Sequence, residues 1–200
     1  WVPTHAVIRV TDHFRHVPMI LWGLCGWKEN GRIITTAEQA GTTAIRPAFE
    51  ALGYTLVKAE GITGFYTVLD TGRPGPEVLI LGELDSIICP AHPESDPVTG
   101  AVHSCGHNAQ CAALLGIAAA LKEPGALEGM CGSIRLMSVP AEELIEIEYR
   151  ESLRKQGIIK SLGGKVEFMS RGYFEGCDIA FMLHTGGSSP DGDYAGSRGQ

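Results

Sequence analysis

A thiol, two imidazoles and three carboxylates fall where regular elements of the chain are expected to begin or end. They belong to Asp85, Cys105, His107, Glu142, Glu143 and His184. Thiolate sulfur and imidazole nitrogen suit zinc, cobalt and nickel, whereas carboxylate oxygen also suits manganese. If the fold brings these side chains together, they indicate a site for a divalent metal ion.

Taken one at a time, these residues also have ordinary structural interpretations. Cys105 could be a small buried apolar side chain, and Asp85 could be a turn or capping residue. Glu142 and Glu143 could form the acidic first turn that a helix dipole favours, and His184 could be a hydrogen-bonded interior histidine. Their placement at corresponding element ends favours a shared metal site over these separate explanations.

Three runs of residues predict strands of the sheet. Residues 77–84 are nearly uninterrupted in apolar character, which is typical of a strand buried on both faces. Residues 133–139 form a strand ended by Pro140, and residues 178–183 another buried strand. A candidate metal ligand or acid follows each run closely along the chain. If the three strands run parallel, these side chains share one edge of the sheet.

Helical patterns alternate with the predicted strands. Helices are expected over residues 35–52, 108–122 and 141–156, and two further strands over residues 54–59 and 64–69. Thr35 or Thr36 can cap the first helix, and Cys105 and His107 come directly before the second. This order predicts an α/β fold with a mixed, mainly parallel sheet and helices on both faces.

Charge and hydropathy exclude two classes of partner. The chain carries 16 Lys and Arg against 23 Asp and Glu, a formal net charge of −7, and no stretch is basic enough to neutralise a row of phosphates. Nucleic acid is therefore not expected. Residues 17–27 are the longest apolar stretch, well short of the about 20 residues that a membrane span needs. No secretion signal is recognisable either, so a cytoplasmic location is expected.

Four short motifs resemble those of one enzyme family. They are GELDS at 82–86, HSCGHNAQ at 103–110, PAEE at 140–143 and MLHTG at 182–186. In this order and spacing they resemble the M20 family of metallopeptidases and amidohydrolases. The Cys-Gly-His form is similar to the amidohydrolase branch, and Asn108, in place of the more common Asp, looks closer to aminobenzoyl-glutamate hydrolase-type members. The resemblance covers about residues 33 to 187 and implies a zinc-peptidase-like catalytic domain.

The resemblance also implies a role for each candidate residue. It implies two divalent metal ions, zinc or manganese with cobalt or nickel also suitable, and Cys105 stands where relatives use a bridging aspartate. His107 and His184 would complete the coordination of one ion, and Glu143 would bind the other. The remaining acids would act on the reaction: Glu142 as the general base, and Asp85 by accepting a hydrogen bond from His107 or orienting the thiolate. His103 belongs to the same motif and is given no role.

Members of the family are longer than this chain. They add a dimerisation domain after about this point and then return to the catalytic domain to supply a last metal-binding histidine. The expected organisation is therefore an unassigned segment over residues 1–30, an incomplete catalytic domain over 31–187, and a linker or truncated end over 188–200. A homodimer is expected for the full-length protein.

Three functional hypotheses follow. The first is metal-dependent hydrolysis of an amide bond in a small N-acyl amino acid, an aminobenzoyl-glutamate-like compound or a dipeptide, with Glu142 as base. The second is a truncated or degenerate domain that acts as a metal-binding or structural module without catalysis. The third makes Cys105 a nucleophile with His107 as its base, although one intervening residue rarely lets two such side chains meet in line.

Overall fold

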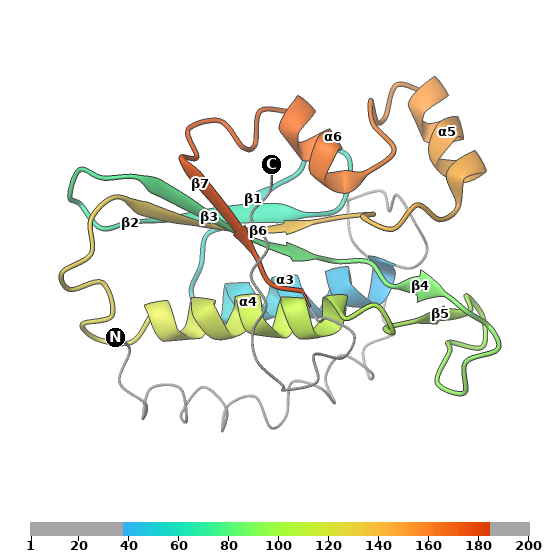
Figure 1. Ribbon diagram of the computed structural model, residues 1–200, viewed down its shortest axis with the longest axis horizontal. Helices are drawn as coiled ribbons and strands as arrows, with labels where there is room; N and C mark the ends of the chain where they lie inside the picture. The colour runs from blue at the N-terminus through green and yellow to red at the C-terminus, as the bar shows by residue number, and fades with distance from the viewer. Residues whose placement is uncertain (1–37, 185–200) are drawn as a thin grey trace, which may run out of the picture.

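The computed structural model describes residues 38–184 of the chain (Figure 1). The unassigned segment 1–30, the capping positions Thr35 and Thr36, and the linker 188–200 all lie outside the described residues. The predicted ligands and acids between Asp85 and His184 all lie within them.

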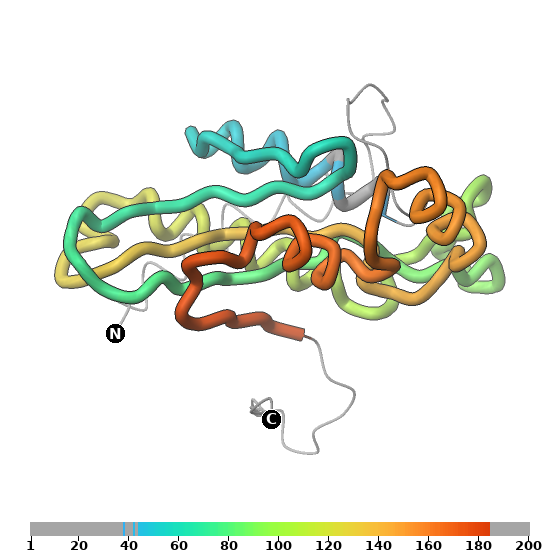
Figure 2. Tube along the Cα trace, turned by 90° about the horizontal axis from the view of Figure 1, so that it is seen from above, coloured from blue at the N-terminus to red at the C-terminus, as the bar shows by residue number. Residues whose placement is uncertain are grey.

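A five-stranded mixed sheet forms the centre of the described part. Its strands are β1 (Val57–Lys58), β2 (Phe65–Asp70), β3 (Glu77–Glu83), β6 (Ser133–Val139) and β7 (Ile179–Met182), in the spatial order β1-β2-β6-β3-β7. Strands β6, β3 and β7 are parallel to one another, whereas β1 and β2 pair antiparallel. Figure 2 shows β7 along one long edge of this sheet. The predicted α/β fold with a mixed sheet is confirmed.

Helices cover both faces of the central strands of the sheet. The prediction that residues 178–183 form a buried strand is wrong, because β7 lies at the edge of the sheet, where Ile179 and Phe181 are 55% and 50% exposed. Figure 1 shows α3 (Gln39–Ala51) and α4 (His107–Leu121) on one face, with α5 (Ile147–Lys155) and α6 (Gly164–Ser170) on the other. Successive residues of β6 point to opposite faces. Leu136 packs with Phe49 and Leu114 on the α3 and α4 side, and its neighbour Met137 packs with Phe168 on the α6 side. Each side of the sheet therefore has its own apolar core.

Close packing of α4 on β3 places the start of this helix beside the end of the strand. A β-carbon on Gly82 would lie 3.1 Å from the Leu114 side chain, so the glycine allows the helix to approach closely. The alanine-rich sequence of α4 has a high helix propensity, and the observed bounds match the predicted helix 108–122 within one residue at each end. His107, the first residue of α4, is completely buried as a result.

The prediction of one helix over residues 141–156 is wrong for its first part. Helix α5 begins only at Ile147. Ala141 and Glu146 have φ angles of 49° and 51°, in the left-handed region that a right-handed helix cannot contain. Glu142 and Glu143 therefore lie in an irregular loop after β6 rather than in a helical first turn.

Three short elements are observed that the sequence patterns did not predict. Helix α6 is one, and the others are β4 (Ile87–Ile88) and β5 (Ala101–Val102), which pair as a small antiparallel sheet between β3 and α4. Elements of two residues are too short to produce a periodic pattern. Among the described residues, no helix is long and apolar enough to cross a membrane.

The contact between α6 and the loop after β6 gives a test of the fold. A β-carbon on Gly164 would lie 1.5 Å from the Pro140 carbonyl oxygen, whereas one on Gly163 would have no atom within 4 Å. We expect Gly164→Ala to lower the free energy of unfolding by about 3 kcal/mol, because overpacking against backbone outweighs the higher helix propensity of alanine.

Urea unfolding of both glycine variants and the parent chain measures this difference. Gly163→Ala is the matched control and should stay within about 0.5 kcal/mol of the parent. Equal stability of the two variants would contradict the described contact between α6 and Pro140.

Candidate metal centre

The candidate residues lie at the edge of the sheet where the three parallel strands end. Glu83 of β3 is in register with Val139 of β6, and Leu81 of β3 with Met182 of β7. The segments that follow these strands therefore leave the sheet at the same edge. The first turn of α4 reaches the same place, so the fold brings together side chains far apart in the sequence.

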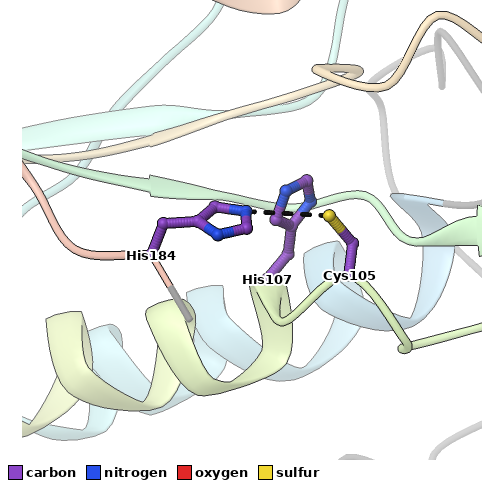
Figure 3. Close-up of side chains that lie close together, drawn as sticks. All are labelled: Cys105, His107 and His184. Carbon is purple, nitrogen blue, oxygen red and sulfur yellow. Dashed lines mark hydrogen bonds between the residues drawn. The ribbon is translucent and has the colours of Figure 1, made fainter. Parts of the chain in front are cut away.

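Cys105, His107 and His184 form the first cluster. Their potential ligand atoms all lie within 4.8 Å of one another. The Cys105 Sγ is 3.6 Å from Nε2 of His184, and the two imidazole rings meet edge to face with centroids 5.6 Å apart. Figure 3 shows the three side chains converging from the end of β7 and the start of α4. One thiol and two imidazoles are a donor set suited to zinc, cobalt or nickel.

Asp85 fixes the orientation of the His107 ring. Nδ1 of His107 lies 3.1 Å from Oδ1 of Asp85 and 3.0 Å from the Asp85 carbonyl oxygen. A carbonyl oxygen can only accept a hydrogen bond, so Nδ1 carries the proton and donates it. The other Asp85 oxygen accepts the backbone N–H of Glu143 at 2.8 Å. Asp85, itself fully buried, thus connects the ends of β3 and β6 to α4.

The opposite nitrogen of His107 is the strongest indication that this histidine is a metal ligand. Nε2 is buried and makes no hydrogen bond, although it lies 3.1 Å from Oε2 of Glu83. In the neutral imidazole that a metal ion requires, with the proton on Nδ1, it presents a lone pair toward the cluster. A buried polar atom without a hydrogen bond is rare in folded proteins and costs free energy. A carboxylate that orients the distal nitrogen of a histidine is the usual arrangement around protein-bound metals. The residues present therefore fit a divalent ion.

A second cluster shares His107 and consists otherwise of carboxylates. Glu83, His107 and Glu142 also bring their potential ligand atoms within 4.8 Å of one another. Nε2 of His107 lies 3.1 Å from Oε2 of Glu83, 3.9 Å from Oε2 of Glu142 and 4.0 Å from Oε1 of Glu143. Both predicted glutamates therefore reach the centre, although not from a helix.

Glu83 is a site residue that the sequence interpretation missed. Its side chain is only 1% exposed, and it lies within the GELDS motif at the last position of β3. The sequence did contain an indication of this role, because a charged residue at the end of a buried apolar strand is uncommon unless it has a partner. Gln110, one turn after His107 on α4, donates to Oε2 of Glu83 at 3.2 Å and to the carbonyl of Leu183 at 2.7 Å.

Lys165 is the second site residue that was missed. Its ammonium pairs with Oε1 of Glu83 and lies 3.3 Å from Oε1 of Glu142. Burial lowers the pKa of Lys165, but the two carboxylates raise it more strongly, so the net pKa is raised and the amine is charged. No residue pattern marked α6 as a helix, so nothing placed its lysine near the site.

The carboxylates shift the pKa values of the two central ligands in a consistent direction. Burial lowers the pKa of His107, but Asp85 and Glu83 together raise it, to about 8. The hydrogen bond with Glu143, followed by burial, raises the pKa of the Cys105 thiol to about 12. A field that stabilises imidazolium and opposes thiolate is a field that attracts cations. A bound divalent ion would reverse the effect on the thiol.

His103 lies close enough to His107 for the two charges to interact. Burial, together with the charge of His107, lowers the pKa of His103, and both of its ring nitrogens are buried without a hydrogen bond. A neutral imidazole is therefore the stable form. Among the described residues, His103 belongs to neither group of potential metal ligands, and it remains without an assigned role.

Comparison with known proteins gives relatives that are hydrolases. No family model matches the chain. Thermostable carboxypeptidase 2 of Saccharolobus solfataricus is 32% identical over 132 residues, which are 64% of this chain and 29% of that protein. One of the subunits of the p-aminobenzoyl-glutamate hydrolase of Escherichia coli is 36% identical over 93 residues, 42% of this chain and 21% of that protein. The chain thus spans less than a third of the length of these relatives.

The solved structures give the corresponding fold. The YXEP protein of Bacillus subtilis, described as a dinuclear metal-binding peptidase from the M20 family, matches with a TM-score of 0.60 and 18% identity over 92% of this chain and 44% of that one. The sequence relatives are thus a carboxypeptidase and a hydrolase, and the solved structure has the fold expected from the four motifs. The predicted resemblance to M20 proteins agrees with both comparisons over the matched part of the chain.

The thiol of Cys105 provides a test that separates a ligand from a nucleophile. In metal-free protein near pH 7.5, we expect iodoacetamide to modify Cys105 at least about a hundredfold more slowly than the exposed Cys131, because only a thiolate reacts and the Cys105 pKa is raised to about 12. Peptide mass spectrometry follows both cysteines in one sample. Glu143→Gln should accelerate modification of Cys105 and leave Cys131 unchanged.

Fast alkylation of Cys105 below pH 9 would contradict this prediction. It would instead support the interpretation of Cys105 as an activated nucleophile.

Proposed function

We propose that the chain provides the metal-binding part of a hydrolase that cleaves amide bonds in small N-acyl amino acids, aminobenzoyl-glutamate-like compounds or dipeptides. The observation that carries the proposal is the convergence of Cys105, His107 and His184 within 4.8 Å, with the buried Nε2 of His107 left without a hydrogen bond. Cysteine and histidine side chains that converge in this way are a common ligand set for zinc.

Residues of the first cluster would hold one ion, and Glu143 would serve a second. Glu143 hydrogen-bonds the Cys105 thiol, which raises the pKa of that thiol, so a carboxylate that could hold a second ion lies beside the sulfur. Zinc or manganese suits this mixture of donors, and cobalt or nickel can replace them. When bound, such ions polarise the scissile carbonyl and make a water molecule more acidic.

Glu142 is positioned to move the proton. Its two oxygens have different partners, since Oε1 lies 3.3 Å from the Lys165 ammonium while Oε2 faces the centre, 3.9 Å from Nε2 of His107. Oε2 can therefore take a proton from the attacking water and deliver it to the leaving nitrogen of the amide. General acid-base transfer by one carboxylate in both directions is the expected chemistry for this class of reaction.

The named relatives support the proposed class of substrate. One is a carboxypeptidase and another a p-aminobenzoyl-glutamate hydrolase, and Indole-3-acetyl-aspartic acid hydrolase of Enterobacter agglomerans is 26% identical over 161 residues, which are 68% of this chain and 36% of that protein. The compounds named in the last two consist of an acyl group joined to an amino acid. We infer a small amide substrate of that chemistry, and a homodimer for the longer protein.

Removal of first-cluster ligands tests metal binding. We expect the purified parent chain to retain at least one equivalent of divalent metal after dialysis, and Cys105→Ala and His107→Ala to lose it, because each substitution removes a ligand atom. Elemental analysis by mass spectrometry measures the content. Cys177→Ala, at a cysteine next to Glu77 at the start of β3, is the control and should keep the metal. A parent chain without metal would favour a structural module.

Replacement of the proposed base tests catalysis separately. Glu142→Gln should reduce turnover of p-aminobenzoyl-glutamate by about a hundredfold to ten-thousandfold, the usual contribution of a general base, with the metal content nearly unchanged. Glu148→Gln, an exposed glutamate of α5, should retain activity. If Glu142→Gln loses metal in proportion to activity, the residue is a ligand and its assignment as base is wrong.

A further inference from the structure

Lys165 brings a positive charge into the carboxylate half of the candidate centre. Its side chain is 32% exposed and enters from α6, and its ammonium contacts Oε1 of both Glu83 and Glu142. Two of the three members of the second cluster are thus bridged by a cation that belongs to the chain itself. The first cluster of Cys105, His107 and His184 is formed without Lys165.

The atoms around the second cluster would otherwise suit a divalent ion. Oε2 of Glu83 and Oε2 of Glu142 face Nε2 of His107 at 3.1 and 3.9 Å, and this buried nitrogen makes no hydrogen bond. Carboxylate oxygens with one imidazole are ligands that manganese accepts readily. The second cluster therefore has the donors for an ion and, in addition, a neighbouring ammonium.

An ammonium and a divalent ion compete for the same pair of carboxylates. Lys165 already neutralises part of their charge, and a divalent ion among the Oε2 atoms would be repelled by a positive charge on the far side of the same carboxyl groups. Glu83 is nearly buried, which places this repulsion in a medium of low polarity where charges interact strongly. The cation that is held more firmly in place therefore occupies the carboxylates of Glu83 and Glu142.

We propose that Lys165 is a positioning residue that acts as an internal cation, keeping a divalent ion away from Glu83 and Glu142 and so leaving Glu142 unliganded. The inference rests on the proposed function, because an unliganded Glu142 is what a proton carrier requires. The inference also explains why the first cluster, rather than the second, takes metal. Metal is then held by the first cluster together with Glu143, whereas Glu83 and Glu142 keep Lys165 as their counter-charge.

Metal titration of a charge-removing variant tests the inference. Lys165→Met keeps the length and apolar stem of the side chain. This variant should bind one more equivalent of Mn²⁺ than the parent chain. The dissociation constant of the extra ion should be at least about tenfold lower than that of any further ion on the parent chain. Equilibrium dialysis with elemental analysis measures number and affinity. Lys155→Met, at an exposed lysine ending α5, is the matched control and should behave as the parent, as should Lys165→Arg.

Two further measurements assign the extra ion to its ligands. Lys165→Met combined with Glu83→Gln should lose the extra equivalent. Titration with Co²⁺ should give the same thiolate-to-metal absorption band in the parent and in Lys165→Met, because that band reports Cys105 and not the carboxylates. If Lys165→Met is too unstable to purify, Lys165→Gln, which keeps a hydrogen-bond donor without the charge, makes the same comparison.

The outcomes separate this inference from the proposed function. If the parent binds metal that depends on Cys105, and removing the Lys165 charge changes neither number nor affinity, the inference is overturned and the proposed function stands. If neither protein binds metal, both are overturned. An extra equivalent that survives Glu83→Gln also overturns the inference, because the ion then binds elsewhere.

Discussion

The carboxylate of Asp85 is the contact on which the geometry of the centre depends. One oxygen receives the Nδ1–H of His107 and the other receives the backbone N–H of Glu143. The first contact turns a histidine at the start of α4, and the second fixes the loop after β6. Because Asp85 directly follows β3, one buried side chain sets the relative positions of three segments that are distant in sequence. A neutral replacement would leave at least one of these donors without a partner.

The same concentration of acids that positions the ligands also opposes folding in the absence of cations. Glu83, Asp85 and His107 are all almost completely buried, and Glu142 and Glu143 are about one-third and one-quarter exposed. Like charges this close repel, and burial of each charged group has a desolvation cost. The protein offsets the cost with donors: the ring of His107, the amide of Gln110 and the ammonium of Lys165. Metal binding and stability of this edge are therefore linked.

Much of the fold and most of the site could be predicted because they depend on local patterns. Apolar runs located β3, β6 and β7, and alanine content located α4 within one residue at each end. Parallel strands bring their carboxyl ends to one edge, so residues that follow such strands are placed near one another by topology alone. This is why Asp85, Glu142 and His184 could be identified as neighbours from positions in the sequence.

What could not be predicted depends on backbone conformations and contacts that no periodic pattern encodes. The left-handed residues Ala141 and Glu146 turn the expected start of a helix into a loop. That loop is held by the close approach of Gly164 to Pro140. Helix α6, seven residues long, is too short to produce a clear amphipathic pattern, so Lys165 could not be placed in space.

The conformation of this loop explains how two adjacent glutamates can take different roles. In a helix, neighbouring side chains diverge by about 100°, and that divergence alone would point the two acids in different directions. In the observed loop, Glu142 and Glu143 differ because they have different contact partners. The backbone of Glu143 is tied to Asp85 and its side chain contacts Cys105, whereas the side chain of Glu142 is drawn toward Lys165.

The proposed division of roles therefore depends on tertiary contacts from two directions, β3 through Asp85 and α6 through Lys165. Either contact alone would fix only one of the two acids. A centre built in this way needs α6 to be packed correctly before Glu142 can be held apart from the metal ligands. Packing on the face of the sheet opposite α4 is thus part of the chemistry at its edge, although α6 contributes no ligand of its own.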